Sequence, residues 1–314
     1  MTAPIVPVIP ETIALAAEIL SEGGIVAMPT ETVYGLAGDA SNPEAVARIY
    51  EAKGRPRFNP LIAHVATLEM AEREAEISGL ARAAAEAFWP GPLTLVLPVK
   101  QGGSVCDLAR AGLDTIGLRL PAHKGARALI AAFGRPLVAP SANRSGHVSP
   151  TRADHVAADL GDRINLILDG GPSEVGVEST ILGFDGETPV LLRPGGIPSE
   201  VIAERLGKPL RLHNEADGIN APGQIKSHYA PKAKLRLNVA TPDEGEGFLA
   251  FGPGAQVGLN LSPSGDLVEA ATKLFAMLRA LDARFERIAV APIPSTGLGE
   301  AINDRLERAA HRDA

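Results

Sequence analysis

The sequence has a single cysteine, Cys106, few aromatic side chains (4% of 314 residues) and no long apolar run. One cysteine excludes an internal disulfide and a cysteine-based zinc centre, so we expect a reduced, cytoplasmic setting. A membrane helix needs roughly 18 apolar residues in succession, and the N-terminal stretch lacks the basic region of a signal peptide. The net charge of −7 argues against a generally basic nucleic-acid coat, so local basic clusters must make any phosphate contact.

Apolar periodicity predicts two α/β units joined by a long linker. Strands and helices alternate over residues 1–207, which indicates one three-layer domain. The pattern fades over 208–234, a linker, and resumes over 235–314 as a small α/β domain. In the first unit we expect strands at 25–28, 61–65, 93–97, 115–120, 137–139, 166–168, 180–182 and 190–192, and helices at 13–20, 43–53, 78–88, 152–160 and 199–206. In the last unit we expect strands LRLNV, FLAFG, GLNL and 288–292, and helices at 267–281 and 300–310.

A basic loop, KGRPRFNPLIAH (53–64), follows a predicted helix and precedes a predicted strand. Lys53, Arg55 and Arg57 lie within five residues of one another, and two prolines stiffen the backbone that carries them. Rigidly held lysine and arginine side chains suit phosphate groups. An ordinary solvated basic loop explains the segment about equally well.

A polar loop, APSANRSGHVSPT (139–151), lies between a short apolar strand and a predicted helix. Small hydrogen-bond donors ahead of a helix N-terminus favour an anion-binding loop. The segment is not a P-loop, because it lacks GxxxxGK[ST], and the serine lacks the GxSxG context of a hydrolase nucleophile. We favour a functional loop here over a simple polar turn.

Other polar segments are weaker when each is taken alone. Strand alternation in TIGLRLP places Thr115 and Arg119 on one face of the sheet, with Gly117 between them. Hydroxyl groups and glycines also follow predicted strands in PTETVYGL (29–36), and they flank strands in GVESTI (176–181) and LRPG (192–195). Strand ends are where ligands bind in open α/β sheets, although turn chemistry explains each segment by itself.

Taken in order, these strings resemble the threonylcarbamoyl-AMP synthase family of the YrdC-like superfamily. APGQIKSHYAP (221–231) and GLGEAINDRLERAA (297–310) resemble the linker and the C-terminal end of its longer, two-domain members. The resemblance implies an α/β fold (α+β in some schemes). It consists of a three-layer YrdC-like domain with a twisted mixed sheet, and a small Rossmann-like C-terminal domain. It also implies that 208–234 forms a lid over the active site.

The resemblance implies a nucleotidyltransferase, L-threonylcarbamoyladenylate synthase, which joins L-threonine, bicarbonate or CO2, and ATP, and releases pyrophosphate. A separate tRNA threonylcarbamoyl-transferase complex then modifies adenosine 37 of tRNAs that read codons starting with A. Carried over by position, the threonine pocket comprises Thr32, His64, Arg119, Ala139 and Ser179. The ATP site comprises Arg55, Asn59, Thr115, Ser141, Asn143, Ser149, Arg193 and Tyr229, with His228 beside it, and the catalytic cations are Lys53, Arg55 and Arg119.

The chemistry fits these residue types, because two anionic reactants need cations to hold them together in line. We expect magnesium to enter with the ATP phosphates rather than on protein ligands. One alternative is a module that binds double-stranded RNA without catalysis, through a groove of Lys53, Arg55, Arg57, Arg144 and Arg193. Others are a carbamoyl-phosphate-using enzyme of hydrogenase maturation, whose relatives are longer and rich in zinc-binding cysteines, and a scaffold with a decayed pocket.

Overall fold

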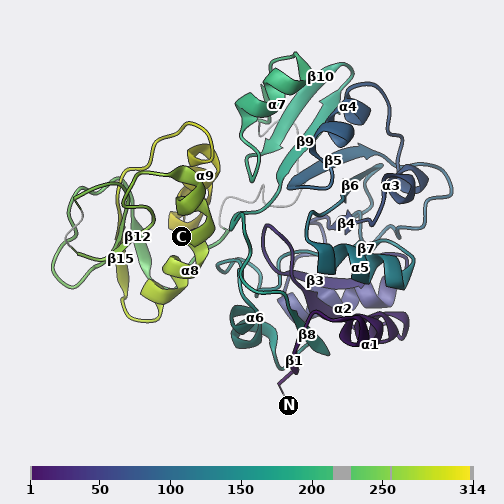
Figure 1. Ribbon diagram of the computed structural model, residues 1–314, viewed down its shortest axis with the longest axis horizontal. Coiled ribbons are helices and arrows are strands. Elements are labelled where there is room, and N and C mark those ends of the chain that lie inside the picture. Colours follow the sequence, from purple (N-terminus) through teal and green to yellow (C-terminus); the bar gives the residue numbers. More distant parts are fainter. Residues whose placement is uncertain (1, 215–227, 255–256, 312–314) are drawn as a thin grey trace.

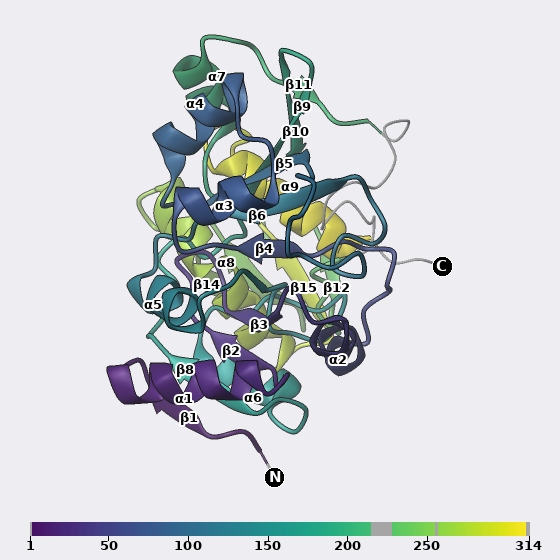
Figure 2. The same ribbon diagram turned by 90° about the vertical axis from the view of Figure 1, so that its right-hand side faces the viewer.

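The structure is a computed structural model that describes residues 2–214, 228–254 and 257–311. Its N-terminal unit is built on a twisted, mixed sheet with the strand order β1-β8-β2-β3-β7-β4-β6-β5-β9-β10-β11. Figure 2 follows this sheet from β1, near the N-terminus at the bottom, to β9, β10 and β11 at the top. The strands are β1 (Ile5–Pro7), β2 (Val26–Met28), β3 (Gly35–Asp39), β4 (Ile62–His64), β5 (Leu93–Pro98), β6 (Thr115–Arg119), β7 (Leu137–Val138), β8 (Leu166–Asp169), β9 (Thr180–Asp185), β10 (Thr188–Arg193) and β11 (Arg211–Leu212).

Helices pack on this sheet and enclose the larger apolar core. Helix α1 packs on α5, α2 on β3, α3 on β6, α4 on β5 and α7, and α6 on β8. The helices are α1 (Pro10–Ser21), α2 (Pro43–Lys53), α3 (Leu68–Glu74), α4 (Gly79–Phe88), α5 (Lys124–Phe133), α6 (Ala153–Leu160) and α7 (Ser199–Leu206).

Local sequence signals explain why α2 ends where the site begins. The Asn42 side chain caps the helix by accepting a 2.9 Å hydrogen bond from the Glu44 N–H, and Pro43 occupies the first turn. Gly54 follows Lys53 in the left-handed conformation (φ 61°), which terminates a helix with no steric penalty from a Cβ. Lys53 is therefore the last residue of α2 and lies at the start of the basic loop.

The C-terminal unit is a smaller α/β layer, as the sequence predicts. Its strands β12 (Lys234–Arg236), β13 (Gly247–Ala250), β14 (Leu259–Asn260) and β15 (Arg287–Val290) form a parallel sheet in the order β12-β15-β13-β14. Helices α8 (Leu267–Asp282) and α9 (Gly299–Ala310) lie between this sheet and the N-terminal unit (Figure 1). The predicted pairing of a large mixed sheet with a small α/β unit is confirmed.

The two units share an apolar core. Val33, Val148 and Val177 of the N-terminal unit pack in one cluster with Phe275 and other residues of α8 and α9. The contact is close, because a Cβ added to Gly176 would lie 2.4 Å from the Ala271 carbonyl oxygen in α8. The C-terminal unit is therefore packed against the loops that follow or precede the site strands.

Several elements escaped the sequence-based expectations. These are β1, β3, α3, α5 and β11. Strand β3 reads GLAGD, a glycine-rich string without strand propensity, yet it is completely buried between β2 and β7. Helix α5 begins at a histidine cap, since His123 Nδ1 accepts a hydrogen bond from the Ala126 N–H at 3.3 Å.

The predicted linker, 208–234, is only partly described. Its first part contains β11, which pairs in parallel with β10 and extends the large sheet beyond residue 207. Residues 215–227 lie outside the described residues, and 228–234 lead into β12. Among the helices that the structure describes, none combines the length and the apolar character of a membrane-spanning segment.

Candidate active site

A pocket lies where several strands of the large sheet end, beneath the start of the C-terminal unit. Of the residues predicted from the sequence, the pocket lining includes Thr32, Arg55, His64, Arg119, Ala139, Ser141, Ser179, Arg193, His228 and Tyr229. Segments distant in sequence thus converge on one cavity, and both predicted halves, the threonine half and the nucleotide half, meet in it.

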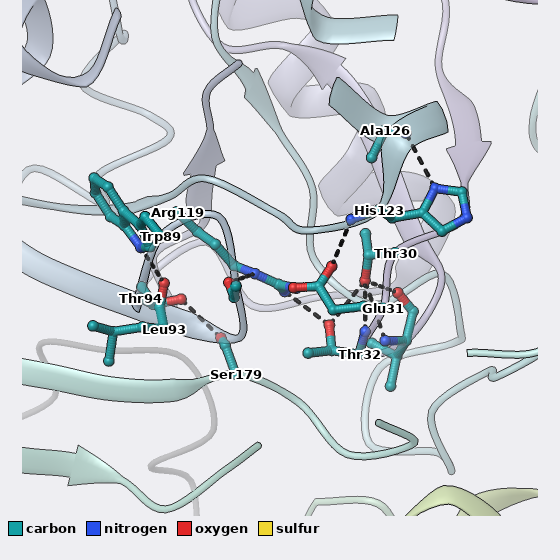
Figure 3. Close-up of polar contacts among 12 residues, drawn as sticks. Thr30, Glu31, Thr32, Trp89, Leu93, Thr94, Arg119, His123, Ala126 and Ser179 are labelled. Carbon is teal, nitrogen blue, oxygen red and sulfur yellow. Dashed lines mark hydrogen bonds and ion pairs between the residues drawn. The ribbon is translucent and has the colours of Figure 1, made fainter. Parts of the chain in front are cut away.

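Arg119, at the end of β6, is the centre of a hydrogen-bond network in the threonine half (Figure 3). Its guanidinium donates to Thr32 Oγ1 at 2.8 Å, to Glu31 Oε1 at 2.5 Å and to the Gly91 carbonyl at 3.3 Å. Burial raises the pKa of the Glu31 carboxyl, but the neighbouring Arg119 charge and its hydrogen bond lower that pKa by a larger amount. The net shift is therefore downward. Glu31 therefore stays ionised and holds the buried arginine in one orientation.

The hydroxyl groups around Arg119 form an ordered chain. Thr30 Oγ1 donates to the Val33 carbonyl at 2.6 Å, and the Thr30 and Thr32 hydroxyls are 2.8 Å apart. Ser179 lies across the pocket, with its Oγ 2.7 Å from Thr94 Oγ1 (Figure 3). Arg193, at the end of β10, donates to the Ser179 carbonyl at 2.8 Å. These contacts fix both walls of the threonine half.

His64 is the last residue of β4 and pairs in register with Arg119 on β6. Its Nδ1 lies 3.3 Å from the Ile62 carbonyl oxygen, which places the proton on Nδ1 and leaves Nε2 as an acceptor. Burial, followed by the Arg119 charge, lowers the pKa of His64 to about 3. The imidazole is therefore neutral at physiological pH.

Lys53 organises the polar loop rather than lining the pocket. Its Nζ donates to the carbonyls of Ser141 and Asn143, each at 2.6 Å, and the side chain is buried. Burial and then the Arg55 charge hold the pKa of Lys53 well below its usual value. The Asn143 amide closes the same loop by donating to the Arg144 and His147 carbonyls. Lys53 and Asn143 thus hold the backbone of the polar loop in place.

Arg55 lines the nucleotide half, and the Asn59 backbone contacts its guanidinium. Arg55 donates to the carbonyls of Asn59 (3.3 Å) and Pro60 (3.0 Å), and burial lowers its pKa to about 10, so it remains a cation. Asn59 is buried too, and its Oδ1 has no hydrogen-bond partner among the described residues. A buried acceptor without a partner in this part of the chain favours a ligand donor at that position.

Two residues that the sequence reading did not select complete this half. Glu178, directly before Ser179, accepts hydrogen bonds from Ser149 Oγ at 2.5 Å and from Arg305 Nε at 2.7 Å. Burial raises the pKa of Glu178, but the Arg305 and Arg193 charges lower it by more, so the net shift is downward. The GVEST string contains Glu178, so its position offered a signal. Nothing in α9 distinguishes Arg305, because its burial depends on packing between the two units.

Tyr229 joins the pocket to the C-terminal unit. It has a left-handed backbone (φ 63°) and is buried, with its ring stacked on Phe275 of α8 at a centroid distance of 5.7 Å. The next residue, Ala230, donates its N–H to the Gly146 carbonyl at 2.7 Å. His228 packs against the Tyr229 ring, and burial and four nearby cations hold its pKa well below the usual value.

Thr115 lies away from this pocket, and Lys53, Asn59, Asn143 and Ser149 are likewise not among its lining residues. It starts β6 whereas Arg119 ends it, and four residues along a strand span about 13 Å. Thr115 lines a separate hollow beside Val96 and Phe184. The resemblance placed Thr115 in the ATP site, and its position at the opposite end of β6 from Arg119 lends that assignment no support in this pocket.

The cations of the site face inward. Lys53, Arg55 and Arg193 are buried, so three of the five cations proposed for an RNA groove are withdrawn from the outer surface. Among the described residues, no group of three or more histidine, cysteine, aspartate or glutamate side chains is arranged to hold a metal ion. The site is therefore one pocket, with buried arginines in its nucleotide half and hydroxyl groups in its threonine half.

Comparisons with known proteins identify the family. The Sua5, YciO and YrdC family model, described as Telomere recombination, matches residues 18–195, and the model described as Threonylcarbamoyl-AMP synthase, C-terminal domain, matches residues 197–311. Threonylcarbamoyl-AMP synthases of Pyrococcus abyssi and Bacillus subtilis are each 42% identical to the chain over 95% of its length, covering 94% and 92% of those proteins. The crystal structure of P. abyssi Sua5 complexed with L-threonine superposes with a TM-score of 0.90 at 40% identity, covering 98% of both chains. The chain belongs to the threonylcarbamoyl-AMP synthase family.

Proposed function

We propose that this pocket joins L-threonine, bicarbonate or CO2, and ATP into threonylcarbamoyl-AMP and pyrophosphate. The observation that carries the proposal is the meeting of two unlike halves in one cavity. One is built around the Arg119 network, and the other around the buried Arg55 and Arg193. The similarity to P. abyssi Sua5 complexed with L-threonine supports the assignment of the first half.

In the threonine half, Arg119 pairs with the substrate carboxylate. An arginine has five N–H donors, and the contacts with Gly91, Thr32 and Glu31 engage one on each nitrogen. Each terminal nitrogen keeps one N–H for the substrate carboxylate. His64 Nε2, which is an acceptor, suits the threonine hydroxyl or amine. A site that hydrogen-bonds the substrate hydroxyl rejects analogues that lack it far more strongly than an apolar pocket does.

In the nucleotide half, the cations hold the phosphates and align the reaction. The threonine nitrogen forms a bond to carbon dioxide and loses a proton, which gives a carbamate. A carbamate oxygen then attacks the α-phosphorus, and the bond from that phosphorus to the pyrophosphate oxygen breaks. Arg55 and Arg193 offset the repulsion between the two anions, while the Lys53-bound loop places Ser141 in the pocket lining and Ser149 donates to Glu178. No covalent intermediate with the protein is needed.

Magnesium fits this site as part of the nucleotide. Among the described residues that line the pocket, Glu178 is the one carboxylate, and both of its oxygens already accept hydrogen bonds. Mg²⁺ commonly binds through substrate phosphates with only one or two carboxylates. We therefore propose that the phosphates carry the ion, which supplies charge neutralisation. Glu178 is the side chain closest in chemistry to a ligand for it.

The decisive experiment measures pyrophosphate release from ATP by the purified chain with magnesium and bicarbonate, with and without L-threonine. We expect release that requires both threonine and bicarbonate, and weaker release with serine. Chelation of magnesium with EDTA should abolish it. Release that is indifferent to threonine, from protein shown to be folded, would overturn the proposal.

The product is an acyl-phosphate type of mixed anhydride, which water hydrolyses. We therefore propose that a tRNA threonylcarbamoyl-transferase complex consumes it, with adenosine 37 as the final acceptor. A reduced, cytoplasmic setting remains part of this proposal. Direct binding of double-stranded RNA is the alternative, and salt-sensitive RNA binding without ATP turnover would favour it.

A further inference from the structure

Arg305 of α9 is a charged side chain with no exposed surface, and it lies where the two units meet. Its Nε donates to Glu178 Oε2 at 2.7 Å, and its Nη2 donates to the Pro194 carbonyl at 3.0 Å. A third contact is the ion pair with Asp304 at 2.5 Å. A buried guanidinium with this set of partners has one orientation, because burial of a charge is tolerated only with paired, well-aligned acceptors.

Through Glu178, Arg305 reaches both halves of the pocket. The second oxygen of Glu178 accepts from Ser149, which belongs to the predicted ATP site. The next residue in the chain, Ser179, belongs to the threonine half, and its carbonyl accepts from Arg193. Glu178 therefore joins Arg305 to the Ser149 hydroxyl behind the pocket and to Ser179, the next residue in the chain, which lines the pocket.

Through Tyr229, Arg305 also supports the roof of the pocket. The guanidinium carbon lies 5.0 Å from the centroid of the Tyr229 ring, on which it makes a cation–π contact. Tyr229 needs such support, because a left-handed backbone is unfavourable for a tyrosine. One side chain of the C-terminal unit thus contacts both the wall and the roof of the nucleotide half without lining the pocket itself.

We propose that Arg305 is a positioning residue for ATP, through which the C-terminal unit completes the nucleotide half of the site. This inference rests on the proposed function, which makes ATP the ligand there. It assigns the C-terminal unit a share in substrate binding, in addition to covering apolar surface.

The test compares wild type with Arg305→Lys, which keeps the positive charge but loses the planar fork and its contact with the tyrosine ring. Pyrophosphate release is measured while ATP is varied at saturating threonine, and MgATP affinity is measured by calorimetry. We expect the KM and Kd for ATP to rise about tenfold, because charge-assisted hydrogen bonds are lost. The KM for threonine should stay within about twofold. A merely structural role would lower the active fraction, and so kcat, without moving either ATP constant.

Glu300→Ala is the matched control. Glu300 lies on the same helix and accepts a 2.7 Å hydrogen bond from Ser199 of the N-terminal unit, but it contacts no site residue in the described part of the chain. We expect its ATP constants to match wild type. ATP constants in Arg305→Lys equal to those of wild type and Glu300→Ala would overturn the proposal.

A second pair of variants covers the case in which Arg305→Lys does not fold. Arg305→Met combined with Glu178→Gln removes both charges together and leaves neither uncompensated. If Arg305 acts on ATP binding largely through Glu178, the double variant should lose less MgATP binding free energy than the sum of the losses in Arg305→Met and Glu178→Gln, and a fully additive loss would contradict this. Wild type that binds MgATP but releases no pyrophosphate would count against the proposed function only, since the binding comparison still decides the role of Arg305.

Discussion

The two halves of the pocket are built on opposite principles. In the threonine half the polar side chains satisfy one another: Arg119 binds Thr32 and Glu31, and Ser179 lies against Thr94. In the nucleotide half, Asn59 Oδ1 and His228 Nδ1 have no hydrogen-bond partner among the described residues. Cations also outnumber carboxylates there, because Arg55 and Arg193 line that part of the pocket while Glu178 is the one carboxylate among the described lining residues.

This difference matches what each half has to bind. A small amino acid needs a rigid pocket whose donors and acceptors are already oriented, because selectivity comes from hydrogen bonds that fit one hydroxyl and one carboxylate. A triphosphate brings its own charge, so a cluster with excess positive charge is stabilised when the ligand arrives. The threonine half is thus held by hydrogen bonds among its own side chains, whereas the lining of the nucleotide half carries an excess of positive charge.

The largest expected effect comes from breaking the threonine half at Arg119. Arg119→Ala should lower kcat/KM for threonine by on the order of 10²–10³-fold, because a buried charged pair with the substrate is lost. The KM for ATP should change little. The variant should also lose about 3–5 kcal/mol of stability, since Glu31 is left buried without its partner. Steady-state pyrophosphate release and urea unfolding measure the two effects.

A paired variant separates these two effects. Arg119→Met with Glu31→Gln removes the buried charges together, so most of the stability should return while threonine turnover stays lost. Normal turnover in either variant would show that the carboxylate is bound by another group.

A smaller effect is expected from the nucleotide half at Lys53. Lys53→Met leaves the Ser141 and Asn143 carbonyls without their shared donor, so the loop should relax and the KM for ATP should rise about tenfold. The KM for threonine should remain close to wild type, because Lys53 contacts none of the threonine half in the described structure.

Arg57→Met provides the matched control for Lys53. Arg57 belongs to the same basic loop, but its side chain is exposed. It should alter neither KM. Equal effects of the two substitutions would mean that the basic loop acts through net charge rather than through the backbone that Lys53 holds.

The contrast between the halves also explains what could be predicted from the sequence. Local signals placed α2 correctly, because the Asn42 cap, Pro43 and Gly54 lie within a dozen residues of one another. The resemblance supplied most pocket residues as a set. The resemblance also assigned Thr115 to the ATP site, but Thr115 begins β6 and lines a separate hollow. Glu31 and Arg305 were missed because their roles depend on partners 88 and 127 residues away in sequence, Arg119 and Glu178 respectively.

The last expected effect concerns pH and the neutral imidazole of the threonine half. His64 has a pKa of about 3 in the folded protein, against the usual 6.5. Between these values the unfolded chain binds more protons, so stability falls as pH falls from 6.5, by up to about 1.4 kcal/mol per unit. His64→Gln removes this proton uptake. Between pH 7 and pH 5, the variant should therefore lose about 2 kcal/mol less stability than wild type.

Urea unfolding of both proteins at pH 5, 6 and 7 measures this difference directly. The stability of the His64→Gln variant should still fall between pH 7 and pH 5, because burial also lowers the pKa of His155 to about 4. The Glu31 and Glu178 carboxyls contribute mainly below pH 4.5, since both have lowered pKa values. Identical losses in the variant and wild type would mean that His64 binds protons equally well in the folded and unfolded states. The threonine half would then gain a second cation beside Arg119 as the pH falls through about 6.5, and it would resemble the nucleotide half in charge.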